Sequence, residues 1–226
     1  IQKTGHIELL KFLRDLIKEK NMTYKLFYAD GSAAQGIQMV LEELEQPYEL
    51  IQSTKDRSKP RPPEQIKINP NGWVPVLMFD DTGMYECVAI TIFLCDRHSE
   101  MNLAPKINDP DRALFLQTLV YFSNSVQTAF QTFYYPDRFT DSIEGEAGAQ
   151  RRGIRRLRET WNVINDQIGN NKWVLGERFS AADLYLFMLT TWFSSTNDHP
   201  KVEEFPNVNR IADAVVLRPS AKLVYK

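Results

Sequence analysis

Two kinds of hydrophobic spacing divide the chain. Up to about residue 98, short apolar runs alternate with helical patterns, and beyond residue 109 the spacing is helical throughout. The short runs predict strands at Tyr24–Tyr28, Tyr48–Gln52 and Val74–Phe79. A helical pattern that includes Ile37 and stops at Pro47 separates the first two. A strand, a helix and a second strand in this order predict that the two strands are parallel.

The rest of this first region predicts a loop, a short helix, a hairpin and a buried helix. Asp80–Gly83 is a hairpin signal, after which Met84 and Tyr85 can pair back antiparallel. Glu64–Ile68 allows only a short helix, and Ser53–Pro63 is predicted to be a loop. Cys87–His98 is apolar on nearly every side, which predicts a buried helix.

The second region predicts helices alone. Long helices are expected at 110–133 and 144–168, and a last one at Val208–Leu217 that Pro219 ends. Ser180 and Asp183 have the spacing of a capping box before a further apolar helix.

An amphipathic helix is predicted before the first strand, at residues 6–20. It could pack on the body or a partner chain, or lie on a membrane surface. We therefore expect an extension at 1–22, an α/β domain at 23–98, a linker at 99–109 and an all-α domain at 110–226.

Composition and charge exclude several classes of protein. The 226 residues carry 27 Lys and Arg against 29 Asp and Glu, so the basic excess of a nucleic-acid binder is missing. No apolar run reaches the length of a membrane-spanning helix. Two cysteines cannot form a disulfide framework or a four-ligand zinc site, and reduced thiols suit the cytoplasm. No metal site is expected.

Conventional catalytic motifs are missing from the sequence. It contains no glycine-rich dinucleotide motif, no phosphate-loop lysine and no His-Glu-x-x-His, and its three histidines lie far apart. The arginine-rich stretch 151–158 is either a phosphate patch or a solvated face, and nearby glutamates favour the face. The aromatic residues of 130–135 belong either to the core or to the wall of an apolar pocket.

Three local features together suggest a small ligand. Gly31 and Ser32 follow a strand and precede a helix, whose N-terminus favours an anion such as an ionised thiol. Val74–Pro75 at a strand start could offer the Val74 peptide group to a peptide-like ligand. Glu86 and Cys87 open a helix that could hold an amine and a carboxylate. A ligand with an amine, a carboxylate, an amide and a thiol would satisfy all three.

These residues resemble the cytosolic glutathione S-transferase superfamily over about residues 24–220, and its bacterial-type members in particular (beta-, theta- or nu-like). The resemblance rests on 69–77, 85–90, 179–183 and 25–32 of this sequence. It implies a thioredoxin-like α/β N-terminal domain followed by an all-α C-terminal domain. It also implies glutathione as co-substrate, a role in detoxification, and a homodimer with helices 110–133 and 144–168 near the two-fold axis.

The resemblance also implies roles for single residues. Val74, beside a cis Pro75, would bind the cysteinyl amide, Glu86 the γ-glutamyl amine, and the Cys87 N–H the adjoining carboxylate. Two departures from the family pattern should weaken binding: Cys87 replaces a Ser or Thr, and Trp73 replaces a residue that meets the glycyl carboxylate. Alternatively, they could shift glutathione binding to other groups, such as Gln52 or Lys67.

The group that holds the glutathione sulfur stays open between Ser32 and Tyr28, with Cys87 or no side chain as further alternatives. The resemblance places a pocket for a small hydrophobic electrophile among residues of the helical domain: Tyr121, Asn124, Gln127, Phe130 and Tyr134. Besides a transferase, the site could serve a glutathione-dependent reductase, peroxidase or ether-cleaving lyase, or a non-catalytic binding module.

Overall fold

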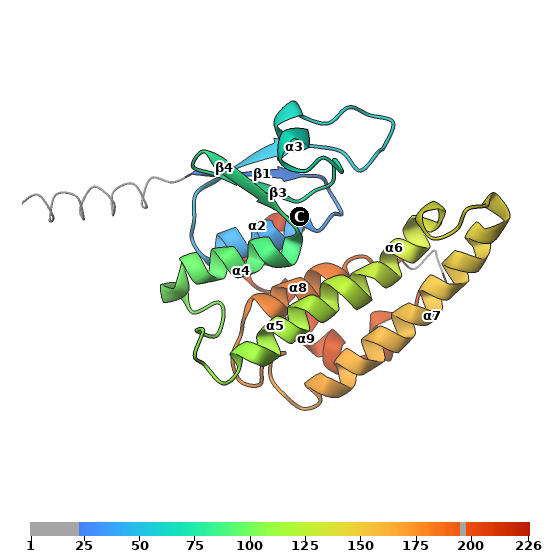
Figure 1. The fold of residues 1–226 in the computed structure, drawn as a ribbon. Coiled ribbons are helices and arrows are strands. Elements are labelled where there is room, and N and C mark those ends of the chain that lie inside the picture. Colours follow the sequence, from blue (N-terminus) through green and yellow to red (C-terminus); the bar gives the residue numbers. More distant parts are fainter. Residues whose placement is uncertain (1–22, 195–197) are drawn as a thin grey trace, which may run out of the picture.

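A computed structural model describes residues 23–194 and 198–226 (Figure 1). The helix predicted at 6–20 and the extension at 1–22 lie outside these residues.

A four-stranded sheet forms the first part of the chain, in the order β2-β1-β3-β4. Its strands are β1 (Tyr24–Tyr28), β2 (Tyr48–Gln52), β3 (Val76–Phe79) and β4 (Thr82–Tyr85). β1 and β2 are parallel, whereas β3 is antiparallel to both β1 and β4. The predicted parallel pair and the predicted hairpin are both confirmed, and β3 begins two residues later than the sequence pattern indicated.

Three helices accompany the sheet: α2 (Ala34–Glu43), α3 (Pro63–Ile68) and α4 (Cys87–Arg97). α2 and α4 lie between the sheet and the helical part, while α3 lies on the far side (Figure 1). The prediction of a buried helix at 87–98 holds for only one face of α4. Ile90 and Leu94 are buried, but Ala89 is exposed and Val88 is half-buried, because only one face of α4 packs against the core.

The remaining helices form the second part. They are α5 (Arg112–Tyr121), α6 (Thr128–Tyr134), α7 (Ile143–Ile168), α8 (Ala181–Thr190), α9 (Pro206–Val216) and α10 (Pro219–Val224). A π-helical segment, Phe122–Gln127, joins α5 to α6, so the long helix predicted at 110–133 is one helical run with a widened middle. Pro219 does end α9, but it also opens α10, where a proline at the first helical turn is well tolerated.

α6 and α7 lie side by side (Figure 1). Gly153 permits this approach, because a Cβ there would lie 2.9 Å from Phe133 N and 3.1 Å from Ala129 O. Both of these are backbone atoms of α6, which a side chain could not displace.

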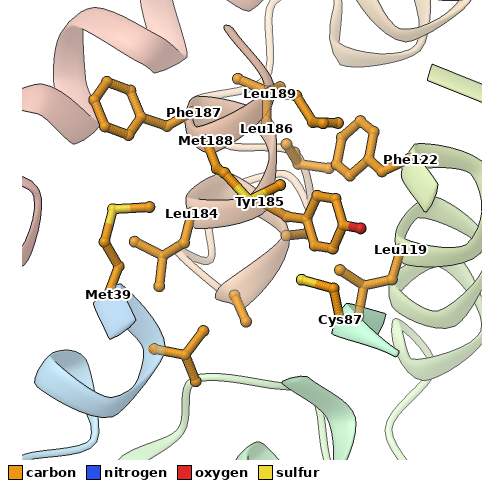
Figure 2. Close-up of a cluster of buried hydrophobic side chains, with 14 of the residues drawn as sticks. Met39, Cys87, Leu119, Phe122, Leu184, Tyr185, Leu186, Phe187, Met188 and Leu189 are labelled. Atoms are coloured by element: carbon orange, nitrogen blue, oxygen red, sulfur yellow. The ribbon is translucent and has the colours of Figure 1, made fainter. Parts of the chain in front are cut away.

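α8 is the centre of the core, with every residue from Ala181 to Leu189 buried. The predicted capping box is present at its start. Asp183 accepts hydrogen bonds from Val174 N at 2.8 Å and Ser180 N at 2.8 Å. Figure 2 shows side chains of α8 meeting Met39 of α2 and Cys87 of α4. The sheet-containing part and the helical part therefore share one hydrophobic core.

Candidate functional site

A cavity of about 720 Å³ lies between the two parts of the chain. One wall comes from the loops after β1 and before β3 and from the start of α4, within residues 31–87. The other comes from the segment 123–138 and from residues 185–193 in and after α8. Such a cavity is large enough to enclose a small ligand.

Most of the residues singled out from the sequence line this cavity. They are Ser32, Trp73, Val74, Pro75, Glu86, Cys87, Asn124, Gln127, Phe130 and Tyr134. Tyr28, Gln52 and Tyr121 are not among its lining residues. Tyr28 packs against the hydrophobic core instead, and the Gln52 side chain donates a hydrogen bond to Ser53 O at 2.9 Å.

The Val74–Pro75 peptide is cis, as predicted. Within residues 23–194 and 198–226, no hydrogen bond engages the main chain of Val74. Its N–H and C=O at the cavity wall can therefore pair with a peptide-like ligand. The preceding loop is held firmly, since Arg61 Nε and Gln65 Nε2 donate to Gly72 O at 2.8 and 2.9 Å.

Gln65 is a supporting residue that the sequence analysis did not single out. It is fully buried on α3, and Ser53 Oγ donates to its side-chain oxygen at 2.5 Å. A lone glutamine in a short predicted helix carries no signal of such a role, because its partners are brought to it by the fold.

Glu86 is the carboxylate among the residues that line the cavity. It precedes α4 with φ 75 and ψ 111, a backbone conformation that non-glycine residues seldom adopt. Residues held in such conformations cluster at functional sites, where the surrounding structure over-determines them. The site thus combines one acid with the free N-terminal end of an eleven-residue helix.

Ser32 lies at the cavity just before α2 and is 7% exposed. Its hydroxyl donates to Ala29 O at 2.5 Å and accepts from Ala34 N at 3.3 Å. The hydroxyl therefore supports the turn into the helix, and its proton must turn away from Ala29 before it can serve a ligand.

Cys87 is a protonated thiol in this setting. Its sulfur lies 3.6 Å from Ala33 O, and burial raises its pKa to about 12. A thiol of this kind is a poor nucleophile despite its place at a helix start.

Tyr185 of α8 is a lining residue that the sequence did not reveal. Its ring points toward Cys87 (Figure 2), its hydroxyl donates to Gln127 Oε1 at 2.7 Å, and burial raises its pKa. In the sequence Tyr185 lies within an apolar helical run, where a tyrosine is predicted to be a core residue.

The helical wall is largely aromatic. Phe130 packs edge-on against Trp192 with ring centroids 5.7 Å apart, and it also stacks with Tyr134 at 6.4 Å. Tyr134 Oη donates to Trp192 O at 2.7 Å, which ties α6 to the segment after α8. Phe130 is 1% exposed and still lines the cavity, so the two readings of this aromatic cluster, core and pocket wall, both hold.

Basic side chains line the cavity as well. Lys55, Arg57 and Arg61 come from the loop between β2 and α3, and Arg138 follows α6. The sequence analysis treated the first three as part of an ordinary loop. The arginine-rich stretch of α7 is elsewhere, and there Arg152 and Arg156 pair with Glu159 at 3.1 and 2.9 Å, as a solvated face would.

The part of the chain that the structure describes contains no group of three or more His, Cys, Asp or Glu residues that could hold a metal ion. No helix among these residues is long and apolar enough to cross a membrane.

Comparison with known proteins gives a consistent picture. Residues 26–102 match the family "Glutathione S-transferase, N-terminal domain", and residues 147–214 match "Glutathione S-transferase, C-terminal domain". The chain is 28% identical over 172 residues to the glutathione S-transferase GstA of Escherichia coli O157:H7, covering 74% of this chain and 81% of that protein. It is 27% identical over 202 residues to the GST-like protein YncG of Escherichia coli K12, covering 87% of this chain and 93% of that protein.

Solved structures share the fold. A glutathione transferase homologue from Sulfitobacter, solved with bound glutathione, superposes with a TM-score of 0.80 at 22% identity, covering 90% of this chain and 97% of that one. The bacterial transferase BphK, solved as a ternary complex, superposes with a TM-score of 0.74 at 24% identity, covering 88% of this chain and 96% of that one.

Proposed function

This chain belongs to the glutathione S-transferase superfamily, and we propose that it activates glutathione for attack on a small hydrophobic electrophile. The observation that carries the proposal is the cavity between the two parts. One of its walls offers peptide-binding groups and a carboxylate, and the other offers aromatic rings.

Each group of glutathione has a counterpart on the first wall. The Val74 peptide can pair with the cysteinyl residue, beside the cis Pro75. Glu86 can bind the γ-glutamyl amine, and the N–H of Cys87 its carboxylate. The sulfur then lies toward Ser32 and the start of α2.

Ser32 is the residue that we propose holds the sulfur as a thiolate. A free thiol has a pKa of about 8.5, and lowering it by two units takes about 2.7 kcal/mol. One hydrogen bond to a charged acceptor plus a helix N-terminus is enough. The Ser32 hydroxyl would turn its proton from Ala29 O to the sulfur, while Ala34 N continues to donate to its oxygen. The thiol proton leaves to solvent.

The electrophile would lie against Phe130, Tyr134 and Trp192, opposite the sulfur. Apolar contacts of this kind favour a hydrophobic body and supply little directional selectivity. The thiolate attacks the electrophilic carbon, a sulfur–carbon bond forms, and the leaving group departs with its electron pair.

We also propose that the protein is a homodimer, with the α5–α6 run and α7 near the two-fold axis. Exposed apolar side chains on these helices support this arrangement: Leu114, Val120 and Val163 are 41%, 52% and 41% exposed. Light scattering should then give twice the 26.2 kDa chain mass. Both cysteines are free thiols, which fits the cytoplasm.

The direct test of the proposed function is calorimetric titration with reduced glutathione. One site per chain is expected. A glutathione analogue without the γ-glutamyl amine should bind more weakly, because Glu86 loses its partner. Failure of glutathione itself to bind would overturn the function without touching the fold.

A further inference from the structure

Arg138 bridges the two walls of the cavity. It lies immediately after α6, at the end of the short helical turn Pro136–Arg138, and it lines the cavity. Its guanidinium lies 4.1 Å from the ring centre of its neighbour Tyr135 and 4.4 Å from that of Trp73. Trp73 belongs to the loop before β3, so a cation of the helical part sits on an aromatic ring of the sheet-containing part.

The guanidinium of Arg138 has no acceptor within residues 23–194 and 198–226. Its Nε is buried without a hydrogen-bond partner, and no hydrogen bond or ion pair to the other nitrogens is present among these residues. An unpaired buried donor is costly, and an arginine carries five N–H groups.

Three other arginines in the structure also stack on aromatic rings, and each of them has a carboxylate. The pairs are Arg97 with Asp80 at 3.6 Å, Arg112 with Asp96 at 2.8 Å, and Arg218 with Glu43 at 2.5 Å. Stacking therefore does not replace an acid partner in this protein. Of these four stacked arginines, Arg138 at the cavity is the one without a carboxylate partner in the described part of the chain.

The other cations that line the cavity are already engaged. Lys55 donates to Gly31 O at 3.2 Å, and Arg61 donates to Gly72 O at 2.8 Å. Arg57 pairs with Asp137 at 2.6 Å, so the carboxylate next to Arg138 in sequence is bound to another arginine. Burial lowers the pKa of Arg138, and the charge of Arg57 adds to this effect. Asp137 and Tyr135 oppose it, but among the described residues Asp137 is the one carboxylate beside the two arginines, so Arg57, Asp137 and Arg138 together carry a net positive charge.

We propose that Arg138, in contact with the rings of Trp73 and Tyr135, is the binding site for a carboxylate of a ligand in the cavity. Both aromatic rings contact the guanidinium but supply no carboxylate, and the planar fork of arginine matches a carboxylate in two parallel hydrogen bonds. The proposal rests on the proposed function, since the carboxylate belongs either to the glycyl residue of glutathione or to an acidic co-substrate.

The experiment compares the wild type with Arg138→Gln, Arg138→Lys and Arg151→Gln by calorimetry. Arg151 is an exposed arginine of α7 away from the cavity and serves as the matched control. Melting curves verify that each variant folds. The ligands are glutathione, its glycyl ethyl ester, and the pair 4-nitrobenzoate and 4-nitrobenzamide, the last two added to protein saturated with S-methylglutathione.

If the carboxylate is that of glutathione, Arg138→Gln weakens glutathione binding by about ten- to a hundredfold and leaves the affinity for the glycyl ethyl ester unchanged. If it belongs to the co-substrate, glutathione binding is unchanged and the same variant removes the preference for 4-nitrobenzoate over the amide. Arg138→Lys keeps the charge without the fork, so an intermediate loss is expected in either case.

Equal behaviour of Arg138→Gln and Arg151→Gln with every ligand would overturn the proposal. If the wild type binds no glutathione, the proposed function fails, and the nitrobenzoate pair is titrated into the ligand-free protein. If the wild type then prefers 4-nitrobenzoate over the amide and Arg138→Gln abolishes this preference, the carboxylate site is still supported. If the wild type shows no such preference, the carboxylate site is rejected as well.

Discussion

The two walls of the cavity are built in different ways. The wall from residues 31–87 presents main-chain groups on short loops, such as the Val74 peptide beside the cis Pro75. The wall from residues 123–193 presents large side chains from helices, such as Phe130 and Trp192. The first is suited to a ligand with a fixed peptide backbone. The second can change with each side-chain substitution, which suits a variable co-substrate.

Both walls depend on one shared support. α8 is buried from Ala181 to Leu189, contacts α2 behind the first wall, and carries Tyr185 into the cavity. Its start is fixed by Asp183, which is itself buried. Changes at Asp183 should therefore disturb the whole molecule, whereas changes at either wall should affect binding alone.

The largest effect is expected for Asp183→Asn. Asparagine keeps one acceptor oxygen but turns an NH2 group toward the other of the two N–H groups, of Val174 and Ser180, that Asp183 binds. One buried N–H therefore loses its acceptor, and the free energy of unfolding should fall by about 2 kcal/mol near neutral pH. Urea unfolding measures it. Asp166→Asn, at an exposed carboxylate of α7, is the matched control and should change little.

The pH dependence of this difference has a definite sign. Burial raises the pKa of Asp183 to about 6 in the folded protein, above about 3.9 for an unfolded chain. The folded state therefore binds the proton more tightly, and the resulting stability is full below pH about 4 and lost as pH rises through about 6. The gap between wild type and variant should widen on acidification, by about 3 kcal/mol. A gap that narrows would mean that the hydrogen bonds outweigh burial.

The next effect concerns the first wall. Glu86→Gln should weaken glutathione binding by about 2 kcal/mol or more, roughly thirtyfold, because the bound amine loses its opposite charge. Calorimetry measures it, with Glu144→Gln as a control at an exposed glutamate of α7. Unchanged affinity in Glu86→Gln would place the γ-glutamyl amine elsewhere.

Ser32→Ala should separate binding from activation. Turnover of an activated aryl chloride should fall about ten- to a hundredfold, since a hydrogen bond to the thiolate is lost. Glutathione affinity should stay within a few fold, because Val74 and Glu86 carry the peptide part. Tyr28→Phe should do less, as Tyr28 does not line the cavity. The reverse ranking would assign the sulfur contact to Tyr28. If neither substitution changes turnover, Cys87→Ser is the next variant to test.

The smallest effect is expected for the thiols of the protein itself. Burial raises the pKa of both Cys87 and Cys95 to about 12. The native protein should resist iodoacetamide at about pH 8, and the unfolded chain should take up label at both positions. Mass spectrometry gives the count. Rapid native labelling of Cys87 would show that its helix start outweighs its burial.

The same contrast between the walls explains what could be predicted from the sequence. The strands, the hairpin and the capping box follow from local spacing and from residues such as Ser180, and the cis peptide at Pro75 follows from the family resemblance; these predictions are confirmed. Tyr185 and Arg138 escaped notice because their surroundings come from segments distant in the sequence. The exposed face of α4 was also missed, since an apolar pattern does not reveal how much of a helix its neighbours cover.

A cavity that activates glutathione must lower the thiol pKa of the bound molecule. The most direct test follows the ultraviolet absorbance of the thiolate against pH, with protein in excess over glutathione. We expect a midpoint about two units below the free value of about 8.5, and a return toward that value in Ser32→Ala. If bound glutathione titrates at the free value in the wild type, the cavity does not activate the thiol and the protein is a binding module.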